Sequence, residues 1–250
     1  MNNEPNIEAN AELTRFLRSN WELLGHADQR AGVPCPPLEK PVPAGATVIR
    51  LPEARLETYR GVDLADAIAN RRSRRSYSDA PIPFATLSFL LFATQGVQKA
   101  NPTNSRRPVA SAGARHAFET YIAAMSVDGL SPGLYRYLPF SHSLCEVRVS
   151  SDLRSEAEAA LLGQGWGAPV IFYWTAIPYR MVWRYEVASA KLIALDAGHV
   201  CQNLYLACEA VGAGTCAIGA YDQALCDEFV GVDGREEMTV YAAPVGLKKS

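Results

Sequence analysis

The stretch "DAGHVCQNLYLACEAVGAGTCAIGAY", residues 196–221, says most about the fold. Its first 16 residues place apolar side chains at helical spacing, and further apolar residues lie on the other face. The first set is Ala197, Val200, Cys201, Leu204, Ala207, Cys208 and Val211, and the second is Leu206 and Ala210. A helix that is apolar nearly all round must be buried, either in the protein core or between two copies of the chain.

Three glycines follow this helix, at positions 212, 214 and 219. They do not form GxGxxG, and they come after a helix rather than before one, so a Rossmann dinucleotide site is disfavoured. His199 is the notable polar group of the helix. No second ligand stands four residues further on, which favours a hydrogen-bonded core histidine over a metal ligand.

Outward from this helix, the chain alternates strands and helices without a strict βαβ order. The continuous apolar run 168–177 is typical of a central strand, and 118–124, 133–137, 144–149 and 238–246 are further strand candidates. Helices are predicted at 83–96, ending at Gly96, and at 64–70, where Asp63 can cap the helix. The order predicts an α+β domain with a central, mostly antiparallel sheet flanked by helices.

The N-terminal part has a different character. Residues 10–25 carry a helical apolar pattern, and residues 34–45 contain five prolines. Such a segment cannot be helical, so we expect an extended arm that lies over the main domain. The regular pattern begins near Asp63, which divides the chain into a helix and arm, 1–60, and a main domain, 61–250.

The run "RRSRRSYSD", residues 71–79, concentrates positive charge in a chain whose formal net charge is -2. Arginine offers a planar fork of donors and serine a small hydroxyl donor, which together suit a phosphate. If the backbone is extended, Arg71, Ser73 and Arg75 can point toward one anion. The alternative is a solvated run at a helix C-terminus, where cations are favourable.

Two further segments could approach a ligand. In "RRPVASAGARH", residues 106–116, the small residues Ala110, Ser111 and Gly113 would let backbone N–H groups come close to a flat molecule, unless the segment is an ordinary loop. Lys248 and Lys249 follow the last strand and could reach an anion or form a frayed tail.

Composition limits the classes of protein. The chain has 250 residues, 48% of them hydrophobic and 20% charged, which allows a sizeable core. The near-neutral charge argues against nucleic-acid binding, and no apolar run approaches the roughly 20 residues of a membrane helix. The N-terminus has no signal-peptide pattern, and the six cysteines show neither CxxC nor zinc spacing. We therefore expect a cytoplasmic protein with reduced, mostly buried thiols and no metal site.

Taken in order, these segments resemble the nitroreductase family of FMN-dependent oxidoreductases. The resemblance covers about residues 60–247, from the arginine run through "LLFATQGVQ", "RRPVASAGARH", "GLYRY", "APVIFYW" and the 196–221 stretch to "VYAAPVG". Within the family the sequence is similar to the SagB-type branch, whose best-understood members oxidise azoline rings in peptides to azoles. The N-terminal helix and arm are also similar to that branch.

The resemblance implies a nitroreductase-like fold with FMN at a homodimer interface. It implies that Arg71, Arg72, Ser73 and Arg75 hold the FMN phosphate and ribityl chain, with help from Lys248 or Lys249. The loop of Ala110, Ser111 and Gly113 would lie by the isoalloxazine ring, and Gly212, Gly214, Ile218 and Gly219 would pack along its other side. The 196–211 helix would form the centre of the dimer, so a single chain is expected to expose Leu204 and its neighbours.

One position departs from the branch. Azoline oxidases carry a Lys-Tyr pair just before the "LDxGH" helix, and this chain has Arg184-Tyr185 there. Lysine can give up its proton when its environment favours the neutral form, whereas arginine effectively cannot. A general base is therefore lost at this position. We expect Arg184 to orient an anionic or carbonyl group and Tyr185 to donate or accept a proton.

The implied activity is dehydrogenation of a small-molecule or peptide-derived substrate, with hydride transfer to flavin N5. An NAD(P)H-dependent reductase of nitro compounds or quinones is the enzymatic alternative, and a flavin-binding scaffold without turnover is the non-enzymatic one. The sequence names neither the substrate nor the electron acceptor.

Overall fold

The computed structural model describes residues 7–59 and 61–249, and its centre is a seven-stranded sheet. The strand order is β1-β6-β5-β4-β7-β9-β8, and every pair of neighbours in it is antiparallel. The strands are β1 (Val48–Arg50), β4 (Phe118–Ala124), β5 (Gly133–Leu138), β6 (Ser143–Arg148), β7 (Val170–Ala176), β8 (Ala213–Thr215) and β9 (Met238–Leu247). The predicted α+β class with an antiparallel sheet is confirmed.

Strand β7 lies in the middle of the sheet and is buried on both faces. Phe172 and Trp174 point into one hydrophobic cluster, and Ile171 and Tyr173 point into another. Alternate side chains of a strand face opposite sides of a sheet. The apolar run 168–177 is continuous because both sides of this strand are covered.

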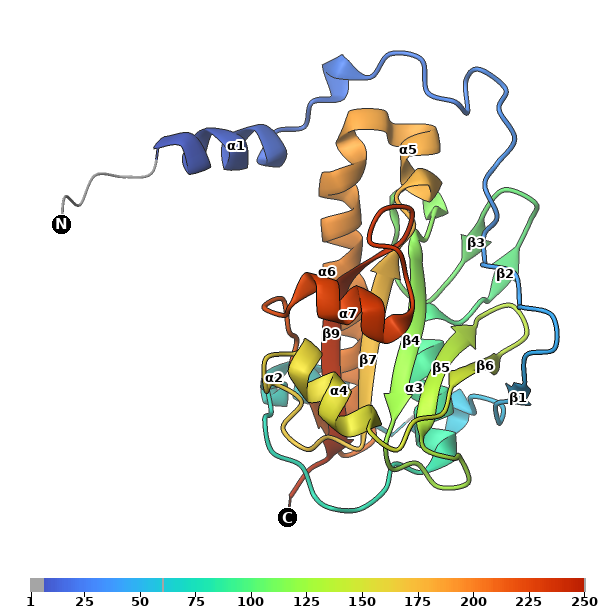
Figure 1. Cartoon of the computed structure of the whole chain (residues 1–250), viewed down its shortest axis with the longest axis vertical. Helices are drawn as coiled ribbons and strands as arrows, with labels where there is room; N and C mark the ends of the chain where they lie inside the picture. Colours follow the sequence, from blue (N-terminus) through green and yellow to red (C-terminus); the bar gives the residue numbers. More distant parts are fainter. Residues whose placement is uncertain (1–6, 60, 250) are drawn as a thin grey trace.

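Helices form one layer on each face (Figure 1). α3 (Phe84–Gln95) and α6 (Ser189–Ala210) contribute to the first cluster, and α4 (Leu153–Ala160) and α7 (Gln223–Val230) contribute to the second. The remaining helices are α1 (Ile7–Leu17), α2 (Leu64–Asn70) and α5 (Tyr179–Tyr185), with short 3-10 turns at Trp21–Leu23, Leu56–Tyr59, Ala112–Ala114 and Glu186–Ala188. A separate hairpin, β2 (Lys99–Ala100) and β3 (Ser105–Arg106), stands beside the sheet.

Helix α6 is buried in its own chain on the side that carries Leu204. That side chain is fully buried, as are Val200, Cys201 and Cys208 next to it, with at most 3% of their surface exposed. The expectation that a single chain exposes Leu204 is therefore wrong, because this face of α6 packs on α3 and the sheet. The opposite face remains open, and Leu195 there is 51% exposed.

The proline-rich arm runs extended along the outside of the main domain (Figure 1). Proline has no N–H, so such a segment cannot pair as an ordinary strand, and its carbonyl groups still need donors. Buried arginines supply them. Arg180 Nε donates to Pro37 O at 2.9 Å, and Arg136 donates to Lys40 O and to Pro41 O, both at 2.9 Å. The 60/61 domain boundary itself falls at residue 60, which lies outside the described residues, and stays a prediction.

Within residues 7–59 and 61–249, no helix is both long and apolar enough to span a bilayer. The six cysteines form no disulfide. Five are buried and Cys35 is half-buried, as expected for mostly buried thiols.

Candidate flavin site

The arginine run follows α2 and is extended along the edge of the sheet. Asp63 caps α2 by accepting from the backbone N–H groups of Ala65 and Asp66, at 2.7 and 3.1 Å. Beyond the helix, Ser73 forms an isolated parallel bridge with Thr215 at the start of the glycine segment. The Ser73 hydroxyl lies 2.9 Å from the Tyr205 hydroxyl on α6, so the run is fixed against that helix.

The structure brings part of the predicted clamp together. The Arg71 guanidinium lies over the Tyr205 ring at 5.3 Å, beside the Ser73 hydroxyl. Arg75 lies instead over the Trp166 ring at 5.6 Å. Arg72 donates to the carbonyls of Ala69 and Arg71, both at 2.8 Å, and so closes the C-terminal end of α2. Arg71 and Ser73 therefore share one location, whereas Arg72 and Arg75 have partners elsewhere.

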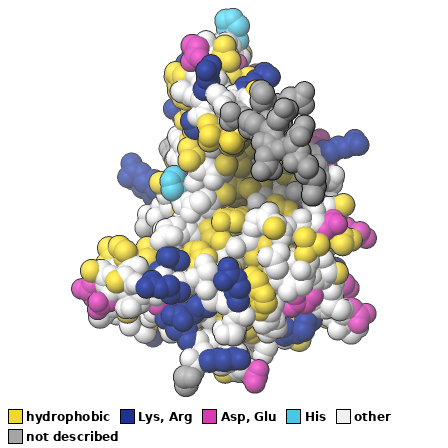
Figure 2. Space-filling view, turned by 90° about the vertical axis from the view of Figure 1, so that its left-hand side faces the viewer, with side chains coloured by type: hydrophobic (Ala, Val, Ile, Leu, Met, Phe, Trp, Pro, Cys, Tyr) yellow, Lys and Arg dark blue, Asp and Glu magenta, His cyan; other side chains and the backbone are white. Residues whose placement is uncertain are grey.

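Positive charge exceeds negative charge around this location. Glu209 on α6 forms an ion pair with Lys248 and lies 4.0 Å from Arg74 Nε, which has no hydrogen-bond partner although it is buried. One carboxylate thus faces both Arg74 and Lys248. Figure 2 shows basic side chains gathered on the face that carries α2, next to a hollow lined by hydrophobic side chains. Lys249, also predicted to assist, is exposed.

The small-residue loop is held by α6 through a buried carboxylate. Asp196 accepts a hydrogen bond of 2.5 Å from the Ser111 hydroxyl and one of 3.2 Å from Ala112 N–H. The same serine oxygen accepts from His116 N–H at 2.9 Å. Burial raises the pKa of Asp196, and the two hydrogen bonds oppose that shift. The Ser111 hydroxyl and Ala112 N–H are thus engaged within the protein, and the loop is rigidly placed.

Gly113 brings the loop against the Arg184-Tyr185 pair. Its φ of +56° is left-handed, and a Cβ there would stand 2.4 Å from the Tyr185 hydroxyl and 3.2 Å from the Arg184 guanidinium. Arg184 also lies over the Tyr185 ring at 5.4 Å. The two groups predicted to act on substrate therefore meet the loop predicted to lie by the ring, over a distance that only glycine permits.

His199 does not lie in the core. Its side chain is 52% exposed, and its Nδ1 is 3.2 Å from Ala110 O, so the expectation of a core histidine is wrong. The reason is its position on α6, one turn beyond Asp196 on the margin that faces the loop.

The glycine segment plays several roles. Gly212 ends α6 with a φ of +69° and has open space around it. Gly214 lies under Arg74, where a Cβ would meet the arginine side chain at 2.6 Å. Ile218 is buried in the second hydrophobic cluster and its backbone N–H and C=O both pair with Ala242, whereas Gly219 is exposed. Gly214 thus makes room for an arginine side chain.

The loop of Ser111 and Gly113 and the cluster of Arg71, Ser73 and Arg74, here called the arginine cluster, lie on opposite sides of α6. Asp196, which holds the loop, and Tyr205, which holds Ser73, are nine residues apart, or about two and a half helical turns. The exposed face with Leu195 and His199 lies between them. Sequence reasoning missed Asp196, Tyr205 and Arg74. Arg74 had a signal as part of the arginine run, and Asp196 had one as a charged residue in an apolar helix, whereas Tyr205 had none.

Comparison with known proteins fits this arrangement. The nitroreductase family model matches residues 68–247. A protein of Methanocaldococcus jannaschii named as a nitroreductase is 30% identical over 200 residues, which is 78% of this chain and 96% of that protein.

Two solved structures are similar as well. One, described as a nitroreductase of Anabaena variabilis, has a TM-score of 0.68 and 25% identity, and covers 82% of this chain. This chain spans only 42% of that one. The other is a chain of the Escherichia coli microcin synthetase McbBCD complex, solved with truncated pro-MccB17 bound. It has a TM-score of 0.60 and 17% identity, and covers 98% of this chain and 95% of that one.

The chain belongs to the nitroreductase family, whose members are typically FMN-dependent oxidoreductases and homodimers. The residues present fit FMN. Arg71, Ser73 and the basic excess around Glu209 suit a phosphate, and the loop that Asp196 fixes can lie against a flat ring.

Proposed function

We propose that the protein is an FMN-dependent dehydrogenase of the SagB type that acts on a small-molecule or peptide-derived substrate. The placement of the loop and the arginine cluster on opposite margins of α6's exposed face carries this proposal. FMN is elongated, with a ring at one end and a phosphate at the other. If two chains pair across this face, the loop of one approaches the arginine cluster of the other, and each FMN lies between subunits.

The microcin synthetase structure supports the choice of substrate class. That complex was solved with truncated pro-MccB17 bound, and the match includes the N-terminal part of this chain. At 17% identity this likeness shows the fold alone, so a peptide-derived substrate is part of our proposal.

In this proposal the protein's own residues bind and orient. FMN, when bound, supplies the two-electron redox chemistry. Arg71 and Ser73 hold its phosphate, and the loop fixed by Asp196 forms a firm wall for its ring. The Tyr185 hydroxyl, against Gly113, hydrogen-bonds the substrate group that gains or loses a proton. The Arg184 guanidinium stabilises negative charge there and can hold a carboxylate by two hydrogen bonds.

The first experiment tests the phosphate clamp by fluorescence titration of FMN. Removing one charged hydrogen bond costs about 1.5–3 kcal/mol, which corresponds to roughly 10- to 150-fold weaker binding. We expect this loss for Arg71→Ala, and a loss at the lower end of this range for Ser73→Ala, because the serine donor carries no charge of its own. Arg72→Ala is the matched control, since its guanidinium caps α2, and it should change the affinity less than 3-fold. Wild-type protein that binds no FMN would refute the proposal.

The second experiment tests the reaction. FMN-loaded protein is mixed anaerobically with thiazoline- or oxazoline-containing peptides, and flavin absorbance is followed. Because Arg184 cannot act as a base, we expect wild type to form azoles slowly, Arg184→Lys to form them faster, and Tyr185→Phe to lower either rate. Efficient azole formation by wild type would overturn the assigned role of Arg184.

A reductase remains the second candidate function, because the Methanocaldococcus and Anabaena relatives are named as nitroreductases. Rapid bleaching of the bound flavin by NADH or NADPH, followed by reoxidation with a nitroaromatic compound or a quinone, would favour it. Flavin that binds but that no donor reduces would favour a scaffold instead.

A further inference from the structure

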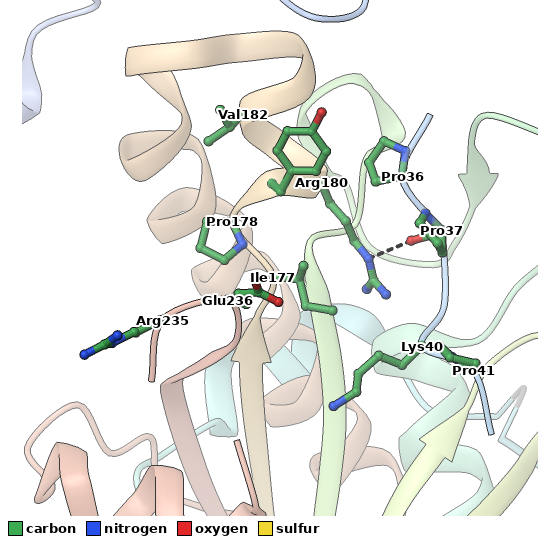
Figure 3. Close-up of a pocket in the computed structure, with 11 residues that line it drawn as sticks. Pro36, Pro37, Lys40, Pro41, Ile177, Pro178, Arg180, Val182, Arg235 and Glu236 are labelled. Atoms are coloured by element: carbon green, nitrogen blue, oxygen red, sulfur yellow. Dashed lines mark hydrogen bonds between the residues drawn. The ribbon is translucent and has the colours of Figure 1, made fainter. Parts of the chain in front are cut away.

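A second concave site lies at the other end of α5 from Tyr185. It is a cavity of about 570 Å³ between the arm, the end of β7 and the loop before β9 (Figure 3). Its walls are mainly apolar and come from Pro36, Pro37, Pro41, Ile177, Pro178 and Val182. Neither Arg184 nor Tyr185 lines it, so this cavity is separate from the pair at Gly113. It shares no residue with the candidate flavin site.

Arg180, which lines the cavity, is only partly neutralised. The side chain is 2% exposed, and its guanidinium lies among the cavity residues, between the arm and β4 (Figure 3). It is 2.5 Å from Glu119, but that carboxylate also pairs with Arg136 at 3.1 Å. Two buried guanidinium groups therefore share one carboxylate, and Arg180 Nη1 has no hydrogen-bond partner.

The surroundings add more positive charge. Arg107 and Arg115 are also buried, and they donate to neutral groups such as the Gln95 side chain and Arg180 O. Burial first, and then the positive charge of Arg180, lower the pKa of Arg107 to about 10 against the opposing effect of Glu119. Half-buried Glu39 interacts with Arg136 and Arg107, so this group of four arginines contains two acidic side chains, Glu119 and Glu39.

The other charged groups at the cavity bring equal numbers of positive and negative charges. Lys40, on the arm, forms an ion pair of 2.5 Å with Glu237. At the rim, exposed Arg235 stands next to exposed Glu236. The remaining excess is the buried arginine group. Uncompensated buried charge is costly, and a bound anion would relieve it.

We propose that this cavity binds a small organic anion with an apolar body and one carboxylate, such as an aryl- or alkyl-carboxylate. The apolar body would occupy the proline and valine walls, and the carboxylate would point toward Arg180. Apolar walls with a few placed polar groups are the usual form of small-molecule sites. This site is independent of the dehydrogenase proposal, since no residue of the flavin site takes part.

The test uses FMN-loaded wild-type protein and isothermal titration calorimetry with 3-phenylpropionate. We expect saturable binding with a Kd below 1 mM. A Kd of 1 mM corresponds to a binding free energy of roughly -4 kcal/mol, which we take as the weakest binding that supports the site. The uncharged analogue 3-phenylpropan-1-ol should bind at least 10-fold more weakly, because it has the same apolar body without the carboxylate. Absence of binding, or equal affinity for the alcohol, would overturn the proposal.

Two variants locate the binding. Val182→Glu places a negative charge at a wall position that is 37% exposed, so the fold should tolerate it, and we expect at least 10-fold weaker binding of 3-phenylpropionate. Val149→Glu, at a 62% exposed position outside the cavity, is the matched control and should bind as wild type does. Flavin absorbance should not respond to the ligand. Unchanged affinity in Val182→Glu, or a flavin response in wild type, would place the ligand elsewhere and refute the site.

Discussion

At the residue scale, Gly113 is under two constraints that can be separated. An alanine at a left-handed φ costs about 1–2 kcal/mol, and a forced close contact adds about 1–3 kcal/mol. Gly212 has a similar φ of +69° but open space around it, so Gly212→Ala should show only the first cost. We predict that Gly113→Ala lowers the free energy of unfolding, measured in urea, by more than Gly212→Ala does.

The contact itself can be tested by removing its other partner. Tyr185→Phe deletes the hydroxyl that a Cβ at position 113 would meet. In the Gly113→Ala background it should therefore restore part of the lost stability, whereas in wild type it should not increase stability. Equal effects in both backgrounds would mean that Tyr185 is not the obstacle.

Asp196 gives a pH-dependent prediction. Its pKa in the folded protein is raised by burial, so the folded state binds this proton more tightly than the unfolded state, where the value is near 3.8. Stability contributed through this group is therefore fully present at low pH and falls as pH rises through the folded pKa. Urea unfolding from pH 4 to 7 should show wild type losing stability with rising pH relative to Asp196→Asn. A constant difference across this range would contradict the shift.

At the element scale, α6 has one face for the core and one open face. Leu204→Ala removes a fully buried side chain and should cost about 2–5 kcal/mol of unfolding free energy in any state of assembly. Leu195→Asp changes a 51% exposed position and should leave that free energy nearly unchanged while shifting the protein to monomers in light scattering. A Leu195→Asp dimer as stable as that of wild type would move the interface away from this face.

Sequence patterns could predict the helices and strands whose side chains are buried at a regular spacing along the chain. β7 and α6 were found because one is covered on both faces and the other on most of its circumference. β1, β2 and β3 were missed because each has two or three residues, too few for a period to show.

The candidate site shows the same limit. Arg71 and Ser73 could be chosen from sequence because arginine and serine occur together in a short run. Tyr205 and Asp196 could not be linked to them or to Ser111, since those contacts span 132 and 85 residues of chain. The fold alone shows that the contacts of Asp196 and Tyr205 lie on opposite sides of α6. This arrangement is the basis of the proposed dimeric site.

At the scale of the whole molecule, the arm is part of the main structural unit. Deleting residues 1–43 would leave the arginines that bind Pro37, Lys40 and Pro41 without those acceptors. Each buried donor left unsatisfied costs about 1–3 kcal/mol, and a typical domain has only about 5–15 kcal/mol in total. We predict that the fragment 44–250 is unfolded or aggregated, as judged by circular dichroism and thermal unfolding.

Deleting residues 1–19 is the matched control. It removes α1, whose Leu13 and Leu17 side chains are 52% and 56% exposed, and leaves every arm contact with the buried arginines in place. The shortened protein should keep a circular dichroism spectrum close to that of wild type. A well-folded 44–250 fragment would show that the arm is dispensable.

The arginines that hold the arm bind its backbone carbonyl groups, and this has a consequence for how the arm can evolve. Every residue type carries a carbonyl, so these arginine contacts at Pro37, Lys40 and Pro41 require an extended path rather than particular side chains, and the Lys40 side chain adds its own ion pair with Glu237. Substitutions along this segment can then accumulate while its attachment persists, provided the arginines are kept. Selection would then act on Arg136 and Arg180 rather than on the arm. Two homologous arms could bind in the same way without having a recognisably similar sequence.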